Sequence, residues 1–358
     1  MCTALHLLMA LTLGFQRPTV DEIAHRHVEA LGGMDKIESI HSYIRHGWYQ
    51  EGSFRTDHAE VIKMRPFLRV IGDEKDPLAG IHEGYDGGAW EYYPDPGIVV
   101  RTVGPAAAAG RHGAMFDDPL VNPKAEGTRL TLEGMKTFAG KETYVVKCTL
   151  VDGFHQDIYV DGSTYMIDAM DELVPMHAFG TRYHTRNVFD DYKPEGGVLY
   201  AHDVKEIDTE TGKVLTESGV FSMDINPDLP WSIFSPPDWK RTQVQEMIQR
   251  IYDERDEPAS VMSTYYQFRG IIDVAASPTA DAVDFVGYQC LKMGHSDTAI
   301  ALLTANVADN PRSARAHFGL GRALEAGGRK DAARKEYLKA LEIDPNYAKA
   351  KAALKSLG

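Results

Sequence analysis

The chain has 358 residues, 43% hydrophobic and 25% charged, a composition typical of a globular protein of about two domains. Its net charge of -14 disfavours binding to a nucleic-acid backbone, and no apolar run approaches the ~20 residues that span a bilayer. The three cysteines lie far apart at positions 2, 148 and 290, which excludes a zinc ribbon or a CxxC redox motif.

The amino terminus begins with an apolar stretch that carries no charge. Residues 7–13 could form the core of a secretory signal, and cleavage could follow Gly14. The basic segment that usually precedes such a core is missing, because the first basic residue is Arg17. We expect residues 1–16 to be signal-like and residues 1–14 to direct export to the bacterial periplasm or beyond. The alternative is a packed or frayed helix.

Residues 19–40 have the pattern of a helix. Thr19 can cap it, and Glu22 three positions later completes a capping box. Gly32 and Gly33 provide its end. An apolar stripe along this segment predicts that one face is buried, and its members are Ile23, His27, Ala30 and Leu31.

From residue 42 to about 226 the hydrophobic pattern has a period of two. Residues 144–150 alternate strictly, and Asp-Gly pairs at 86–87, 152–153 and 161–162 separate such runs. Asp-Gly between alternating runs indicates a β-hairpin. We therefore predict a curved antiparallel sheet of about ten strands with one packed face.

Most of residues 20–238 resemble the lipoprotein-carrier (LolA-like) family. The resemblance rests on ordered segments that include HVEALGGMDKIESIHS, RPFLRV, YDGGAWEYYP, YVVKCTLVDG and INPDLPWSIFSPP. It implies an incomplete β-barrel over an apolar cavity, which the carriers use for acyl chains. This chain departs from the carriers in lacking an obvious lid helix within the sheet, and we expect residues 104–113, GPAAAAGRHG, to form a flexible loop.

Aromatic and apolar residues on the expected concave face are the candidates for lining that cavity. They are Ile44, Trp48, Met64, Trp90 and Tyr92. The alternative for each of them is an ordinary place in the hydrophobic core.

The carboxyl-terminal third contains a repeat with a period of 34 residues. Gly287, Gly294, Ala299 and Pro311 recur at the matching positions 321, 328, 333 and 345. The small residues Gly287 and Ala299 allow two antiparallel helices to approach each other. Gly294 ends the first helix, and Pro311 ends the second. This pattern resembles the tetratricopeptide repeat (TPR), which implies a protein-binding surface.

Charge supports a boundary near residue 238. Residues 241–358 contain 16 basic and 15 acidic residues, whereas residues 1–240 contain 22 and 37. We predict a LolA-like antiparallel half-barrel over 17–238, linking helices over 239–279, and two TPR repeats with a capping helix over 280–358. The fold class is α+β followed by an all-α helical hairpin domain.

Known catalytic and cofactor motifs are missing. The sequence has no HExxH, GxSxG, SxxK, GxxxxGKS/T or GxGxxG pattern, and His177 and His184 are seven residues apart without a ligand spacing. We therefore expect no metal, no cofactor and no catalytic residues. Cys148 and Cys290 lie on apolar faces, so we expect both to be buried thiols.

Three hypotheses follow. The first is an exported, non-catalytic protein that holds an apolar ligand, a lipid or a lipidated protein in the sheet and binds a protein partner through the TPR groove, with at most peripheral membrane contact. The second is a TPR scaffold or adaptor without a small-molecule site. The third is an unrecognised hydrolase whose site is assembled from scattered residues.

Overall fold

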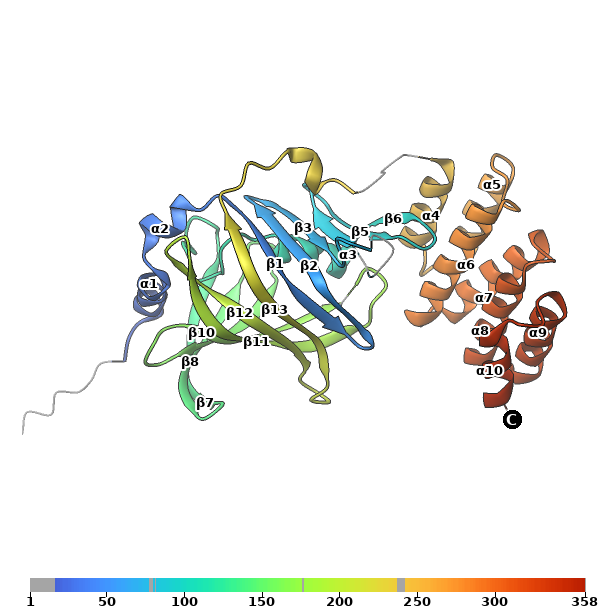
Figure 1. Ribbon diagram of the computed structural model, residues 1–358. Coiled ribbons are helices and arrows are strands. Elements are labelled where there is room, and N and C mark those ends of the chain that lie inside the picture. Colours follow the sequence, from blue (N-terminus) through green and yellow to red (C-terminus); the bar gives the residue numbers. More distant parts are fainter. Residues whose placement is uncertain (1–16, 77–79, 81, 176, 237–241, 358) are drawn as a thin grey trace, which may run out of the picture.

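Among the residues that the computed structural model describes, 17–76, 80, 82–175, 177–236 and 242–357, thirteen strands form one antiparallel sheet (Figure 1). The sequence analysis expected about ten. The strands are β1 (Ser42–Glu51), β2 (Phe54–Met64), β3 (Phe67–Ile71), β4 (His82–Tyr85), β5 (Ala89–Tyr93), β6 (Ile98–Arg101), β7 (Arg129–Phe138), β8 (Lys141–Thr149), β9 (His155–Asp161), β10 (Ile167–Pro175), β11 (Arg182–Glu195), β12 (Val198–Asp208) and β13 (Val214–Ile225).

The strand order is that of two meanders joined in the middle. It runs β6-β5-β4-β3-β2-β1-β13-β12-β11-β10-β9-β8-β7, so β1 and β13 pair at the centre, while β6 and β7 are the edges. The expected Asp-Gly turns connect β4 to β5, β8 to β9 and β9 to β10. The prediction of an antiparallel, unclosed sheet is therefore confirmed.

The segment expected to be a flexible loop is a helix. Residues Gly104–Gly113 form α3, with Pro105 in its first turn and four alanines after it. Alanine has the highest helix propensity, and proline is well tolerated at a helix start, which explains the difference. Helix α3 contacts both β5 and β10, which have seven strands between them in the sheet order, so the sheet bends around it.

The predicted amino-terminal helix is α1 (Val20–Leu31), followed by the short helix α2 (Met34–Ser39). Thr19 and Glu22 form the expected capping box, and Gly32 has a φ of 127° at the helix end. Ile23 is fully buried in a core that includes Val146 and Ile158 of the sheet. The expected signal-like residues 1–16 lie outside the described residues.

The carboxyl-terminal part is built from antiparallel helix pairs (Figure 1). After a 3-10 turn, η1 (Trp231–Phe234), the helices are α4 (Gln243–Asp253), α5 (Pro258–Arg269), α6 (Ser277–Lys292), α7 (Ser296–Asp309), α8 (Ala314–Ala326), α9 (Lys330–Ile343) and α10 (Ala348–Ser356). A Cβ atom on Gly287 would lie 2.8 Å from Leu303, and one on Gly321 would lie 2.5 Å from Tyr337. The small residues therefore set the helix spacing, as the repeat predicts.

The linking helices α4 and α5 pack against each other and against α6 and α7. They thus extend the stack of helix pairs, while the boundaries at 238 and 279 stay predictions. The sheet and the helices share one hydrophobic core. In it, Tyr93 and Phe179 from the sheet side contact Phe285, with ring centroids 4.8 and 5.9 Å apart, respectively.

Candidate functional site

The concave face of the sheet encloses a cavity of about 670 Å³. This volume lies within the range of small-molecule sites in proteins, about 300–1,000 Å³. Strands on both sides of the central β1–β13 pair supply its apolar wall, whose members include Trp48, Tyr49, Phe54, Ala59, Val61, Val70, Ile71, Val204 and Val220.

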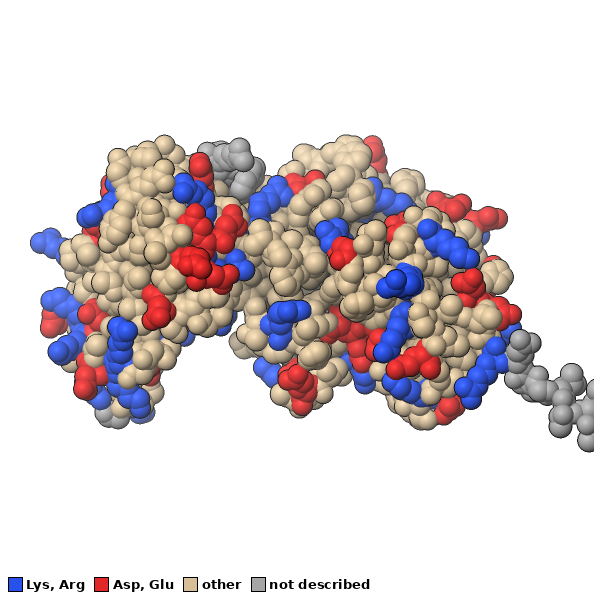
Figure 2. Space-filling view, turned by 180° about the vertical axis from the view of Figure 1, so that it is seen from behind, with Lys and Arg blue, Asp and Glu red and all other residues tan. Residues whose placement is uncertain are grey.

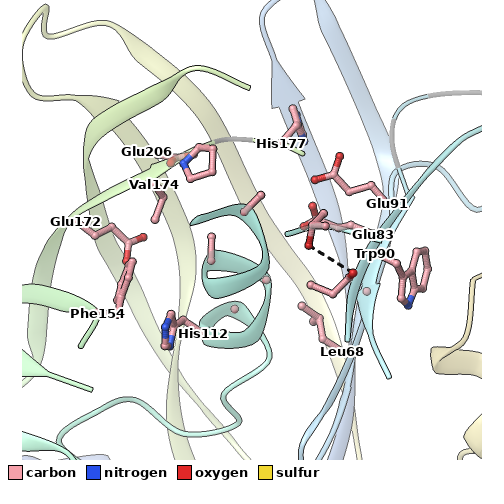
Figure 3. A pocket seen from close by; sticks show the side chains of 18 of the residues that line it. Leu68, Glu83, Trp90, Glu91, His112, Phe154, Glu172, Val174, His177 and Glu206 are labelled. Atoms are coloured by element: carbon pink, nitrogen blue, oxygen red, sulfur yellow. Dashed lines mark hydrogen bonds between the residues drawn. The ribbon is translucent and has the colours of Figure 1, made fainter. Parts of the chain in front are cut away.

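A second, smaller cavity of about 270 Å³ lies beside α3. Ala106, Ala109 and Gly110 of α3 line it, opposite side chains from β4, β5 and β10 (Figure 3). Glu83, His177 and Glu206 line both cavities. These three polar residues therefore mark the place where the two cavities meet.

A pair of glutamates faces this junction from neighbouring strands. Glu83 of β4 lies directly across from Glu91 of β5 in the antiparallel register. Like charges at such a position repel each other. Glu91 is 5% exposed, and its carboxylate accepts hydrogen bonds from the Tyr93 hydroxyl and from the Ala178 amide, the latter at 2.6 Å.

His177 completes the cluster from the segment after β10. Its Nε2 lies 3.3 Å from both carboxylate oxygens of Glu51, the last residue of β1. Its Nδ1 is buried and has no hydrogen-bond partner among the described residues. Figure 3 shows Glu83, Glu91 and His177 gathered around one space, with Glu206 beyond them.

Burial and mutual repulsion shift the protonation of these groups. Burial, together with the charge of Glu91, raises the pKa of Glu83 to about 7, and burial also raises the pKa of Glu91. Burial opposes protonation of His177, but its hydrogen bond with Glu51 and the surrounding carboxylates outweigh this effect and raise its pKa to about 9. The same hydrogen bond lowers the pKa of Glu51. The site therefore concentrates negative charge that only partly ionises near neutral pH.

Charged side chains of both signs occupy the one face of the molecule that Figure 2 draws. Figure 2 shows acidic and basic side chains scattered over both the sheet and the helical part of one face. The carboxylate cluster is thus an interior feature of the curved sheet, where charges act more strongly because water is partly excluded.

Of the residues predicted to line a cavity, Trp48 lines the large one. Its indole ring also stacks against the Arg55 guanidinium, at 4.4 Å from the ring centroid. Ile44, Met64 and Tyr92 are half-buried and line neither of the two cavities. The assignment of Ile44, Trp48, Met64 and Tyr92 to a ligand-binding site stays a prediction.

Trp90 occupies a different environment. It is 1% exposed, and its Nε1 donates a hydrogen bond of 3.0 Å to the carbonyl of Phe234 in η1. Figure 3 shows its indole on the far side of β5, pointing away from the carboxylate cluster. Although Trp90 borders the small cavity, its side chain belongs to the core beneath η1.

The sequence analysis did not select Glu83 or Glu91, and it discounted His177 because His184 lies at no ligand spacing from it. A two-residue Asp86-Gly87 turn would pair Glu83 with Trp90, whereas the observed connection of three residues, 86–88, places Glu83 across from Glu91. No sequence signal brings His177 to them, since 86 residues separate it from Glu91. Cys148 and Cys290 are buried free thiols, as predicted, and burial raises the pKa of each to about 12.

Comparison with known proteins supports the repeat assignment. The tetratricopeptide repeat family matches residues 291–348, so the helical part contains a TPR module. A search of curated proteins found no match. None of the described helices combines the length and hydrophobicity required to cross a membrane.

Solved structures similar to the sheet part come from several bacteria. A DUF1329 family protein from Desulfovibrio piger shares 13% identity at a TM-score of 0.38, over 61% of this chain and 97% of its own. A putative outer membrane lipoprotein-sorting protein domain from Vibrio parahaemolyticus shares 14% at 0.38, over 61% and 96%. A LolA superfamily protein from Nitrosomonas europaea shares 14% at 0.36, over 58% and 96%. LolA-like domains are thus among the structures that this chain resembles.

Proposed function

We propose that this protein is a non-catalytic binding protein whose curved sheet holds an amphiphilic ligand. The observation that carries this proposal is the 670 Å³ cavity, which has an apolar wall and a polar end. Its wall suits an acyl or alkyl chain, because burial of apolar surface contributes about 25 cal/mol per Å². Its polar end, formed by Glu51, Glu83, His177 and Glu206, suits a hydrogen-bonding head group.

The sequence suggested an apolar ligand, a lipid or a lipidated protein, and we favour the ligands that carry a polar head group. A hydrocarbon without a head group would leave the carboxylates of Glu83 and Glu206 desolvated and without new partners, which costs free energy. A ligand with a polar head satisfies these groups and fills the apolar wall at the same time. Lipids and the lipid moiety of a lipidated protein both have this character.

Native mass spectrometry of the delipidated full chain, mixed with a bacterial lipid extract, tests the proposal. We expect one lipid molecule per chain. Ala59→Trp would fill the cavity from β2, where Ala59 lies on its wall, and should abolish the lipid adduct. Ala125→Trp adds the same side chain at an exposed position and should leave the adduct unchanged. Persistently bare wild-type protein, or equal binding by both variants, would refute the proposal.

The helical repeats are proposed to contact a protein partner. TPR modules bind partners on the concave side of the stacked helices. In this chain the β5–β6 hairpin already lies against that stack, since Tyr93 packs on Phe285 of α6, and Asp95 lies 3.7 Å from Arg315 of α8. We therefore propose that a partner uses the part of the TPR module beyond this hairpin, and that the protein works in the cell envelope after export.

The first alternative is a scaffold without a ligand. Truncation after residue 309 would separate the two roles if it abolished partner binding and left lipid binding intact.

The second alternative is a hydrolase. The convergence of His177 with Glu51 and Glu83 favours testing it. Hydrolysis of p-nitrophenyl esters that disappears in His177→Gln would support an enzyme. A rate equal to the background would contradict it.

A further inference from the structure

The three side chains at the junction of the cavities have the donor set of a metal site. One carboxylate oxygen each from Glu83 and Glu91 and one ring nitrogen of His177 all lie within 4.8 Å of one another. The three residues come from β4, from β5 and from the segment after β10, so the fold, and not one short motif, brings them together. Bond lengths of 2.0–2.2 Å place the ligand atoms of one ion no more than about 4.4 Å apart, so small side-chain movements would bring these three donors onto one ion.

The two glutamates have no permanently charged side chain as a partner in the described part of the chain. Burial raises the pKa of both, and His177, when it is protonated, supplies a positive charge that acts against this rise. No lysine or arginine among the described residues forms an ion pair with Glu83 or Glu91. The fold nevertheless places these carboxylates directly opposite each other at the interior end of a hairpin. A divalent cation bound between the two carboxylates would offset their repulsion.

His177 supplies an independent observation. Its Nε2 faces the Glu51 carboxylate, whereas its Nδ1 is buried without a hydrogen-bond partner among the described residues. A histidine that binds a metal through one nitrogen usually directs the other toward a carboxylate or carbonyl, which fixes the ring. In this chain Glu51 is the carboxylate that would fix the ring of His177. A buried Nδ1 without a hydrogen-bond partner costs free energy, and a bound metal ion would remove this cost.

We propose that Glu83, Glu91 and His177 bind one divalent transition-metal ion of the zinc class, with Glu51 orienting the histidine. A mixed nitrogen and carboxylate donor set suits such ions better than Mg²⁺ or Ca²⁺, which prefer all-oxygen ligands. Three protein ligands would leave at least one coordination position open, and two of the three, Glu83 and His177, line both cavities. The metal would share Glu83 and His177 with the polar end of the proposed lipid cavity, but its binding can be measured without a lipid.

Isothermal titration of the metal-free full chain with Zn²⁺ tests the site, and titration with Co²⁺ reports the geometry through visible absorption. We expect one tightly bound ion per chain and Co²⁺ bands of a four- or five-coordinate site. Glu83→Gln and His177→Gln should each weaken binding at least tenfold. Glu172→Gln is the matched control, because Glu172 lines the small cavity but bonds to Gln156 and Asn187. It should bind as the wild type does.

Several results would overturn the proposal. The first is the absence of a stoichiometric ion, and the second is displacement of the ion by a hundredfold excess of Mg²⁺. The third is unchanged binding by both Glu83→Gln and His177→Gln, which would assign the metal to exposed histidines. Circular dichroism of each variant shows whether it is folded. If Glu83→Gln does not fold, His177→Gln decides the question alone. Lipid binding measured on the same samples separates failure of the metal site from failure of the ligand cavity.

Discussion

Gln245 of α4 hydrogen-bonds to both backbone groups of Val99 on the edge strand β6. Its Oε1 accepts from the Val99 amide at 2.9 Å, and its Nε2 donates to the Val99 carbonyl. One helical turn later, Gln249 makes the same pair of bonds with Arg101, at 2.8 and 2.9 Å. Two glutamine side chains thus replace the missing neighbouring strand and protect an edge that could otherwise pair with another chain.

Gln245→Ala should destabilise the junction between sheet and helices. It leaves a buried N–H and a buried C=O of Val99 without partners, which costs about 2–3 kcal/mol. Thermal denaturation measures the loss of stability, and hydrogen exchange should show faster exchange at Val99. Gln243→Ala, at an exposed position of the same helix, is the control and should change neither.

Gly321→Ala should destabilise the TPR module by about 2 kcal/mol. The new methyl group would lie 2.5 Å from the ring of Tyr337, which is fully buried and cannot move aside easily. Gly270→Ala adds the same group where its nearest neighbour is 3.5 Å away, and its stability should match the wild type. Chemical denaturation of both variants checks this, and equal midpoints would show that the close approach is not required.

Asp152→Asn should loosen α3 over the small cavity. Asp152 binds the side chain of Arg111 and lies 3.0 Å from His112 Nε2, and both partners lie near the end of α3. Asparagine retains the bond from the Phe154 amide but removes the charge, a loss of about 1 kcal/mol. We expect about fivefold faster hydrogen exchange over residues 104–113. Glu126→Gln, an exposed change of the same kind, should leave the exchange unaffected.

Asp161→Asn should make stability less dependent on acid pH. Burial opposes ionisation of Asp161, but hydrogen bonds from Ser163 and Thr164 outweigh it and lower its pKa to about 2. A carboxyl with a lowered pKa stabilises the fold above its unfolded value of 3.8, and this contribution is lost as the pH falls through about 2. Because water screens part of this interaction, the variant should be only about 1 kcal/mol less stable at pH 7, and the difference should disappear as the pH falls below about 2, by urea denaturation. A constant difference over this range would contradict the assignment.

Local patterns in the sequence determined much of the fold. The capping box at Thr19, the Asp-Gly turns and the 34-residue repeat each depend on interactions between residues near one another in the chain, and each has its predicted place. Alternation with a period of two indicated antiparallel strands for the same reason. Helix α3 was missed because flanking glycines suggested a loop, although its alanines favour a helix.

The site itself depended on the tertiary structure. Trp48 and Trp90 each border a cavity, but the Trp48 ring stacks against Arg55 and the Trp90 ring lies beneath η1, and no pattern in the sequence distinguishes these environments. The meeting of Glu91 with His177, and of Val99 with Gln245, joins residues 86 and 146 positions apart. No local periodicity carries such contacts; they arise only when the sheet curves around α3 and its edge packs against α4.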